Sequence, residues 1–329
     1  MDPPTYDLPA IQKQPKSYHP LSFHVLALLM PFSVLGVLAR LGLSALATYS
    51  GQSIFSLAYA QATGCLIMGF CLALKEPFSR YYPPAYIALT TGFCGSLTTF
   101  SGWQLDIFKS WLNSSNAPRS ALNTVMDGLS KSVFTISLSL ASLFFGMHIA
   151  TEISPYFRAA PPPGRFFRSA ATVLAICIYA ATIPAYYLLP RDYRHQATSA
   201  LLFSFPGTLT RYLLSTHLNA VVPSFPLGTY AANSFGTALL GTFHVLQSTG
   251  NRPLSSASCT TLQGLSDGYC GCLTTVSTFV AELSALKTTG HKYRYGLTTF
   301  LTGQIILVCI FGALLWGGNI VKDQTCVFD

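Results

Sequence analysis

Residues 92–103 read Gly-Phe-Cys-Gly-Ser-Leu-Thr-Thr-Phe-Ser-Gly-Trp, and residues 268–279 read Gly-Tyr-Cys-Gly-Cys-Leu-Thr-Thr-Val-Ser-Thr-Phe. The two stretches lie about 176 residues apart, each inside a long apolar segment. An internal repeat of this kind indicates a duplicated fold. Its glycines and its Thr-Thr pair free backbone amide and carbonyl groups from a helix, and lipid offers such groups no partner. We therefore expect two broken helices that meet at the middle of a membrane and face protein, an ion or a water-filled path.

The composition is that of a membrane protein. Of 329 residues, 50% are hydrophobic and only 9% are charged, against about 25% charged in a soluble domain. The formal net charge is +8, but the basic residues lie in short connections between apolar segments. They form no basic run of the kind that binds nucleic acid. We predict an all-α membrane protein whose basic residues anchor and orient its helices.

Windows of about 20 apolar residues predict helices that cross the bilayer. A proline-rich linker at 154–164 divides these helices into a group of four and, after it, a lone helix and a second group of four. We predict nine crossings, at about 22–48, 54–74, 84–105, 129–150, 169–189, 199–219, 226–247, 259–284 and 295–317.

The predicted domain organisation follows from these crossings. A first four-helix repeat at 22–150 and a second at 191–318 flank a linker with one helix at 151–190. Residues 1–21 are rich in proline and lack the apolar core of a signal peptide, so we expect a disordered N-terminal tail. Residues 319–329 form a C-terminal tail.

The two halves match beyond the opening motif. The first helix of each half carries an embedded arginine, Arg40 or Arg211, four residues after a glycine. The second helix of each half has an amide residue, Gln61 or Asn233, three residues before a glycine. Four-helix repeats in direct succession share one orientation, whereas one intervening crossing inverts the second copy. The fold class is therefore two inverted four-helix repeats joined by one linker helix, with the third helix of each repeat broken.

The orientation in the membrane is weakly marked. With the N-terminus inside, the inner tail and loops hold ten Lys and Arg residues and the outer segments hold seven. The positive-inside rule then favours a cytoplasmic N-terminus slightly. The Asn113-Ser-Ser115 glycosylation acceptor would face outside in this orientation.

No catalytic or metal-binding arrangement is visible. The nine cysteines lack a metal-ligand spacing, and we expect them to be small buried side chains. Asp267 and Glu282 bracket the second broken helix, and each is expected to be isolated. Without a nucleophile–base pair, the chain is not expected to be an enzyme. Four single histidines near the ends of crossings are expected at the membrane interface, namely His24, His148, His217 and His244.

The remaining polar side chains of the crossings favour transport of an anion. Carboxylates are scarce there, whereas neutral hydrogen-bond donors are common: Thr98, Thr99, Ser101, Asn233, Thr274, Thr275, Ser277 and Thr302. Phe100 and Phe279 add ring edges, the electropositive part of an aromatic ring. Arg40 and Arg211 add positive potential, and a charge inside a crossing indicates a functional role. Alternatively, these hydroxyls only bond the backbone or a neighbouring helix.

With these elements the sequence resembles the Fluc/CrcB fluoride channels, in particular the eukaryotic fluoride export proteins (FEX). The resemblance rests on Gly36–Arg40, Gln61–Gly64 and Gly92–Trp103, and on Gly207–Tyr212, Gly228–Gly236 and Gly268–Phe279. It implies a passive, fluoride-selective channel with fused halves. It also implies a structural Na⁺ at the midplane, held by backbone carbonyl groups of both helix breaks. The matching residues here are Gly95, Thr98, Gly271 and Thr274.

The chain departs from the family pattern in each half. The family's Phe-Ser-Thr-Phe ending is Phe100-Ser-Gly-Trp103 in one half and Val276-Ser-Thr-Phe279 in the other. Gln61 stands where the family has asparagine, while Asn233 keeps it. The family implies two paths, each drawing one phenylalanine from each half. Phe100 and Phe279 complete one path, whereas Trp103 and Val276 leave the other degraded. We infer one working pore, with Gln61, Trp103 and Val276 as vestigial residues.

The leading hypothesis is a passive plasma-membrane channel that exports cytoplasmic fluoride. We expect it to be a monomer in the lipid bilayer, because its two fused halves take the place of the two subunits of a dimer. Its implied pore residues are Asn233, Phe100, Phe279, Thr99, Ser101, Thr275, Ser277, Arg40 and Arg211. A proton-coupled small-solute transporter with inverted repeats is the alternative, and a membrane protein with a structural role is a third. Proton coupling needs a titratable side chain at the midplane, and the sequence offers no clear candidate.

Overall fold

The structure, a computed structural model, describes residues 18–52, 54–114, 116–156, 161–249, 254–318, 320–321 and 324–328. Within these residues every element is helical. Most of the predicted tail at 1–21, residues 157–160 of the proline-rich linker and Ser115 of the glycosylation acceptor lie outside the described residues.

The first half holds α1 (Phe23–Leu46), α2 (Leu57–Ala73), α3 (Lys75–Tyr81), α4 (Pro83–Ile87), η1 (Ala88–Cys94), α5 (Gly95–Leu97), α6 (Phe100–Trp111), α7 (Ala121–Ile153) and η2 (Ser154–Tyr156). The linker region holds α8 (Arg165–Ala180) and α9 (Thr182–Leu188). The second half holds η3 (Arg194–Thr198), α10 (Ser199–Leu218), α11 (Leu227–Gln247), α12 (Ser256–Gly264), η4 (Leu265–Cys270), α13 (Gly271–Leu273), α14 (Ser277–Ala285), α15 (Thr289–Leu307), η5 (Val308–Gly312) and α16 (Ala313–Trp316).

Several of these helices suit a bilayer by length and composition. Among the described residues, four segments are long and apolar enough to cross: Phe23–Leu46, Ala121–Tyr156, Arg165–Leu188 and Thr289–Trp316. The bent pair α2 and α3, at 73°, raises the number to five. Large apolar side chains on α7, α8 and α15 are exposed, as lipid-facing side chains are, including Phe144, Phe145, Val173, Leu174, Leu297 and Leu301. The class of helical membrane protein is confirmed, while the number of nine crossings stays a prediction.

Each half contains a helix that breaks at its Thr-Thr pair. In the first half, α4, η1 and α5 form one rod over 83–97, and the backbone is extended at Thr98 (φ −95°, ψ 148°) before α6 begins. In the second half, α12, η4 and α13 form a rod over 256–273, and Thr274 is extended in the same way (φ −98°, ψ 152°) before α14 begins. Both breaks therefore fall inside the repeated motif.

The segments after the two breaks cross to the opposite half. Helix α6 packs against α11 of the second half, and α14 packs against α2 of the first half. Each rod stays with its own half, since α1 packs on η1 and α5 while α10 packs on η4 and α13. Helices α1 and α10 also pack on each other. The contacts of one half thus recur in the other, and the two breaks lie together at the centre.

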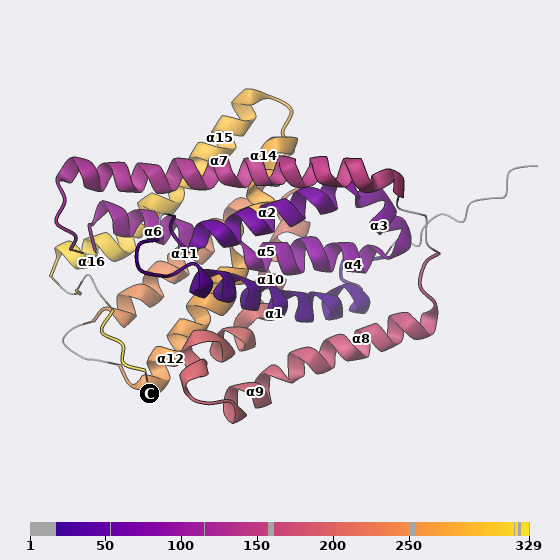
Figure 1. Cartoon of the computed structure of the whole chain (residues 1–329), viewed down its shortest axis with the longest axis horizontal. Coiled ribbons are helices and arrows are strands. Elements are labelled where there is room, and N and C mark those ends of the chain that lie inside the picture. Colours follow the sequence, from indigo (N-terminus) through magenta and orange to yellow (C-terminus); the bar gives the residue numbers. More distant parts are fainter. Residues whose placement is uncertain are drawn as a thin grey trace, which may run out of the picture.

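The outer helices close around this centre. Helix α7 lies alongside α2, and the linker helix α8 lies against α1 on the opposite side of the molecule (Figure 1). Glycines permit the close approach of α2 and α7, because a Cβ atom on Gly69 would lie 1.9 Å from the carbonyl oxygen of Leu143. Small residues at helix interfaces serve the same purpose in other membrane proteins. The largest buried cluster of apolar side chains lies between α2, α6, α7, α11, α14 and α15.

Candidate functional site

Two matched clusters of buried hydroxyl groups lie at the crossed breaks. In the first cluster, Thr98 Oγ1 lies 3.1 Å from Thr275 Oγ1 and 3.0 Å from Ser277 Oγ, and the Ser277 amide donates to Thr98 Oγ1. All three residues are buried. One hydroxyl group comes from the first half and two from the second, so this cluster joins the two halves.

The second cluster exchanges the roles of the halves. Thr274 Oγ1 lies 3.0 Å from Thr99 Oγ1 and 2.9 Å from Ser101 Oγ, and the Ser101 amide donates to Thr274 Oγ1. All three residues are buried. The structure therefore brings six predicted hydroxyl residues together in two groups of three. The eighth predicted donor, Thr302, lies elsewhere, with its hydroxyl 3.2 Å from the Tyr230 hydroxyl.

The two predicted amide residues hold the breaks in different ways. Asn233 accepts from the backbone amide of Thr275 at 2.9 Å and donates to the carbonyl of the same residue at 3.3 Å. Gln61 donates to the carbonyl of Thr99 at 2.7 Å, and its own Oε1 is buried without a hydrogen-bond partner. Asparagine thus satisfies both backbone groups of its threonine, whereas the longer glutamine satisfies one and leaves an acceptor unused.

The predicted aromatic residues meet beside the hydroxyl clusters. The Phe100 and Phe279 rings lie 5.7 Å apart between centroids in an edge-to-face arrangement. The Trp103 ring lies 5.5 Å from Phe100, also edge to face. Val276 belongs to the same buried cluster as these three rings. The structure thus brings Phe100 and Phe279 together but does not set Trp103 and Val276 apart from them. The separation into two paths stays a prediction.

The two embedded arginines bind backbone carbonyl groups of the broken helices. Arg40 is 4% exposed, and its Nη1 donates to Ser96 O at 2.9 Å and to Gly271 O at 2.7 Å, while its Nη2 donates to Asp267 O. Arg40 therefore ties the first helix of one half to the broken helices of both halves.

Arg211 makes the matching contacts in the second half. It is 2% exposed, and it donates from Nε to Cys272 O and from Nη2 to Thr91 O, both at 2.8 Å. Its guanidinium group lies against Gly95, just as that of Arg40 lies against Gly271. A buried charge is costly unless it is paired or fully hydrogen-bonded. The hydrogen bonds to these carbonyl groups therefore allow both arginines to be buried at this depth.

The predicted sodium ligands are consistent with a cation only in part. The extended backbone at Thr98 and Thr274 turns their carbonyl groups out of the helical ladder, and hard oxygen atoms suit a hard cation. The carbonyl of Gly271, in contrast, already accepts from Arg40. Among the described residues no group of three His, Cys, Asp or Glu could hold a metal ion, so backbone oxygens would have to supply the ligands.

A cavity of about 320 Å³ opens beside the second hydroxyl cluster. Thr99 and Ser101 of that cluster line it, and so does Arg40. Its other polar lining comes from α1, the start of α2, α6, α11, α12, η4 and the C-terminal segment: Ser44, Ser56, Asp106, Lys109, His244, Gln247, Gln263, Ser266, Asp267 and Gln324. The cavity therefore gives polar access to one of the two clusters.

The lining of this cavity continues along one face of α11. Asn233, Thr237, Leu240, His244 and Gln247 recur at three- and four-residue intervals, so they share a face, and all five are buried. Three of them line the cavity. The corresponding face of α2 carries Gln61, Cys65, Met68 and Leu72, so it is apolar after Gln61. A polar face thus leads from the break to the cavity on α11, and the matching face of α2 is apolar.

The structure corrects two expectations about single polar residues. His244 is not interfacial, because it is 3% exposed and lines the cavity. Neither carboxylate is isolated, because that of Glu282 accepts from Tyr295 Oη, from Thr229 Oγ1 and from Asn219 Nδ2 at 2.7 to 2.9 Å. The carboxylate of Asp267 accepts from Gln263 Nε2 at 2.7 Å. The spacing along α11 was the signal for His244, since that residue falls on the face of Asn233. No local pattern marks the partners of Glu282, which come from three separate helical segments.

Two of the nine cysteines form a disulfide, which corrects the expectation that all are small buried side chains. Cys259 at the start of α12 pairs with Cys326 near the C-terminus, across 67 residues of sequence. Of the other seven, Cys177 and Cys309 are exposed and the remaining five are buried. No spacing rule could have found this pair, because the two residues belong to segments that meet only in the folded chain.

The fold and the site together define a class of protein. Two copies of a broken-helix unit, crossed at buried hydroxyl clusters among lipid-suited helices, make this a duplicated helical membrane protein with a polar centre. The family model described as CrcB-like protein, Camphor Resistance (CrcB), matches residues 27–147 and again residues 198–317. The chain therefore belongs to the CrcB family, which confirms the resemblance found in the sequence.

Curated relatives carry fluoride in their names. The chain is 34% identical to fluoride export protein 1 of Neurospora crassa, over 89% of this chain and 67% of that protein. It is 32% identical to fluoride export protein 1 of Candida albicans, over 86% of this chain and 78% of that protein. A bacterial relative, the fluoride-specific ion channel FluC 2 of Staphylococcus haemolyticus, is 40% identical over 34% of this chain and 88% of its own length. No solved structure matches the chain at a comparable level.

Proposed function

We propose that the protein is a channel through which fluoride leaves the cytoplasm passively. The observation that carries this proposal is the pair of hydroxyl clusters at the crossed breaks, in a chain that belongs to the CrcB family. Its relatives are named as fluoride export proteins and fluoride-specific channels, which are not enzymes. Because hydrogen fluoride crosses membranes as a neutral molecule and ionises inside, a passive anion path is sufficient for export.

The residues at the breaks offer fluoride a substitute for its hydration shell. Each hydroxyl group has one proton and can rotate it from a neighbouring oxygen towards an anion. Nδ2 of Asn233 and the edges of the Phe100 and Phe279 rings add further electropositive groups nearby. Arg40 and Arg211, held on backbone carbonyl groups, keep the local potential positive without a mobile counter-ion.

A single working path along α11 is part of this proposal. It is supported by the polar face that leads from Asn233 to His244 and Gln247, and by the cavity at the end of that face. The corresponding face of α2 carries Cys65, Met68 and Leu72 after Gln61 and offers an anion only the weak S–H donor of Cys65. The second path then serves as a scaffold.

A structural Na⁺ between the two breaks is a further part of the proposal. Thr98 and Thr274 would hold it through their carbonyl oxygens, because both leave the helical ladder where α5 and α13 contact each other. The cation would neutralise carbonyl dipoles that no lipid or helix satisfies. The Gly271 carbonyl already accepts a hydrogen bond from Arg40. Any sodium ligands beyond the carbonyl groups of Thr98 and Thr274 would therefore be other backbone oxygen atoms at the breaks.

We further propose nine crossings with inverted halves, in a monomer in the plasma membrane, with the N-terminus in the cytoplasm. The Cys259–Cys326 disulfide supports this orientation, because disulfides persist in oxidising compartments. It would place the C-terminus and the cavity mouth, which Gln324 lines, on the outer face.

The orientation predicts opposite locations for the two ends of the chain. A reporter fused to the N-terminus should be protected from protease added outside intact cells, and one fused to the C-terminus should be cleaved. The physical reason is that an odd number of crossings puts the ends on opposite faces. Both reporters in the same compartment would contradict nine crossings and leave an even number.

The function itself is tested by flux. Purified protein in liposomes loaded with fluoride should release it, as followed with a fluoride electrode, while chloride release stays at the level of protein-free liposomes. Release at the same rate with and without a pH gradient is expected of a channel. Fluoride release that requires a proton gradient would instead favour the proton-coupled transporter, and no release would contradict both.

A further inference from the structure

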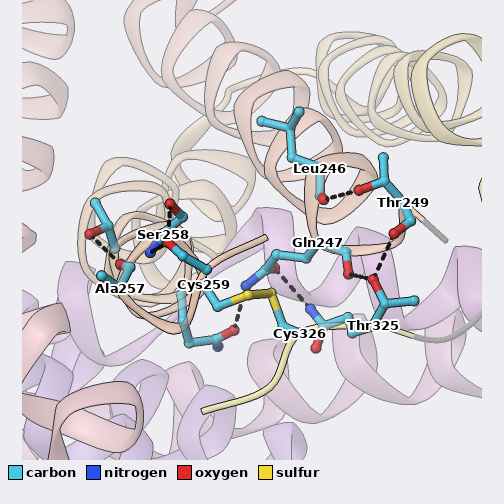
Figure 2. The surroundings of a disulfide bond; sticks show 12 residues. Leu246, Gln247, Thr249, Ala257, Ser258, Cys259, Thr325 and Cys326 are labelled. Atoms are coloured by element: carbon cyan, nitrogen blue, oxygen red, sulfur yellow. Dashed lines mark hydrogen bonds between the residues drawn. A yellow bond between two sulfur atoms is a disulfide. The ribbon is translucent and has the colours of Figure 1, made fainter. Parts of the chain in front are cut away.

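The C-terminal segment forms a strap across the outer end of α11. We use the name C-terminal strap for residues 320–321 and 324–328. Its backbone amides at Val321 and Thr325 donate to Ser248 O at 3.0 Å and to Gln247 O at 2.8 Å. The Thr325 hydroxyl lies within hydrogen-bond distance of the carbonyl groups of Gln247 and Thr249, and the neighbouring Cys326 is bonded to Cys259 (Figure 2). The strap is therefore fixed to α11 by hydrogen bonds and to α12 by a covalent bond.

The strap also supplies one side chain to the cavity wall. Gln324 Nε2 donates to Gln247 Oε1 at 2.9 Å, and the same nitrogen lies 3.2 Å from His244 Nδ1. Gln247 donates in turn to Gln263, and Gln263 donates to the carboxylate of Asp267. All five of these residues line the cavity. Gln324 is thus the first donor of an oriented chain of side chains around the mouth.

This arrangement determines which atoms of the wall are already paired. An amide nitrogen can only donate, so His244 Nδ1 must accept and the ring carries its proton on Nε2. Without Gln324, two acceptors would lose their donor, His244 Nδ1 and Gln247 Oε1. The lone pairs of an unpaired acceptor repel an anion. When Gln324 donates to these acceptors, their lone pairs are directed at its amide hydrogens and not at the cavity.

We propose that Gln324 is a positioning residue for anion entry from the outer face, a direction that is open to a passive channel, and that the Cys259–Cys326 disulfide keeps it in place. This inference rests on the proposed fluoride channel, whose outer mouth it concerns. Breaking the disulfide frees the strap, so that Gln324 leaves the wall part of the time and the acceptors of His244 and Gln247 become unpaired. The mouth then admits fluoride less readily, and the channel becomes sensitive to reductants on its outer face.

The expected effect is on entry rather than on the site at the breaks. Loss of one hydrogen-bond donor from the wall should lower fluoride flux about two- to tenfold when fluoride is far below saturation. At saturating fluoride the flux should return to the wild-type value, because entry no longer limits it. A variant that only misfolds would lower flux by the same factor at every concentration, which separates a positioning role from a structural one.

The experiment compares three forms of the full chain in liposomes. Wild-type protein is treated from outside with a membrane-impermeant phosphine reductant, and disulfide cleavage is checked by thiol labelling and mass spectrometry. Gln324→Leu removes the donor and keeps the disulfide, and Cys326→Ser removes the disulfide. Each should lower flux at low fluoride only, and the reductant should have no further effect on Cys326→Ser. Fluoride is supplied on the side that the reductant reaches, so that it enters through the outer mouth, and its uptake is measured over a concentration series.

A second measurement does not depend on flux. Diethyl pyrocarbonate should modify His244 slowly in the oxidised wild type and faster after reduction, because Gln324 no longer occupies Nδ1; peptide mapping reports the site. Faster modification in a protein without fluoride flux would contradict the proposed function and leave the strap's role supported. Cleavage of the disulfide that changes neither His244 modification nor flux at low fluoride would overturn the inference, even if Cys326→Ser fails to fold.

Discussion

Replacing Asn233 with aspartate is expected to abolish most fluoride flux while the protein still reaches the cell surface. Asn233 now accepts from the Thr275 amide and donates to the Thr275 carbonyl. Aspartate keeps the acceptor but turns the donor into a second acceptor opposite a carbonyl, and it adds a negative charge beside the anion's path. An unsatisfied partner in a buried site costs about 1–3 kcal/mol, which is about tenfold to a hundredfold in flux if this step limits conduction.

Phe279→Ile should have a comparable effect through the aromatic pair. The Phe279 ring meets Phe100 edge to face at 5.7 Å, and isoleucine keeps the apolar volume but removes the electropositive ring edge. The measurement for both variants is growth of fluoride-sensitive cells over a range of fluoride, with surface expression determined in parallel.

Gln61→Asn and Val276→Ile are the matched controls. Gln61 is the counterpart of Asn233 in the first half, and Val276 is the counterpart of Phe100 in the second half. Both belong to the path that we expect to be degraded, so both variants should preserve growth on fluoride. Equal damage from the two sets of variants would indicate two working paths. Harmless changes at Asn233 and Phe279 would show that the other path conducts.

The repeated motif was sufficient to predict the centre of the molecule. Two glycines and a Thr-Thr pair cannot continue a regular helix inside lipid, so the sequence alone placed the breaks where Thr98 and Thr274 leave the helical conformation. The embedded arginines followed from the same logic, because a charge at that depth needs several acceptors, and the breaks provide them. These features are either local in sequence or present in both halves. Where a feature occurs in both halves, its interpretation in one half can be compared with the same position in the other.

Features that join distant segments could not be predicted in this way. The Cys259–Cys326 bond, the chain of side chains that starts at Gln324 and the partners of Glu282 each bring together parts of the chain far apart in sequence. Within the part of the chain that the structure describes, none of the three has a counterpart in the other half. Symmetry gave no information there, and single residues such as His244 were interpreted by their position near a helix end.

Gly271→Ala is expected to prevent the two halves from assembling. A Cβ atom at residue 271 would lie 2.2 Å from Nη2 of Arg40 and 2.6 Å from its Cζ, far inside contact distance. The guanidinium group cannot move aside without losing its bonds to the carbonyl groups of Ser96, Gly271 and Asp267. A buried charge that loses its partners destabilises a protein by about 3–5 kcal/mol. The yield of monodisperse protein in detergent and its thermal unfolding temperature should both fall sharply.

Gly42→Ala is the matched control, because it lies two residues from Arg40 on the same helix and a Cβ atom there would meet nothing within 4 Å. It should leave yield and unfolding temperature unchanged.

A double-mutant cycle with Arg40→Met identifies the cause of the defect. Methionine removes both the charge and the planar group that a Cβ atom at residue 271 would strike, at the cost of the three hydrogen bonds that Arg40 donates. If the steric clash with the guanidinium is the cause, Gly271→Ala should add little further loss of stability in the Arg40→Met background, because two residues in contact are not additive. Full additivity would instead assign the defect to the backbone of the break itself, where alanine would have to be incompatible with the turn from α13 to Thr274. The φ of −64° at Gly271 is one that alanine adopts freely, which favours the clash as the cause.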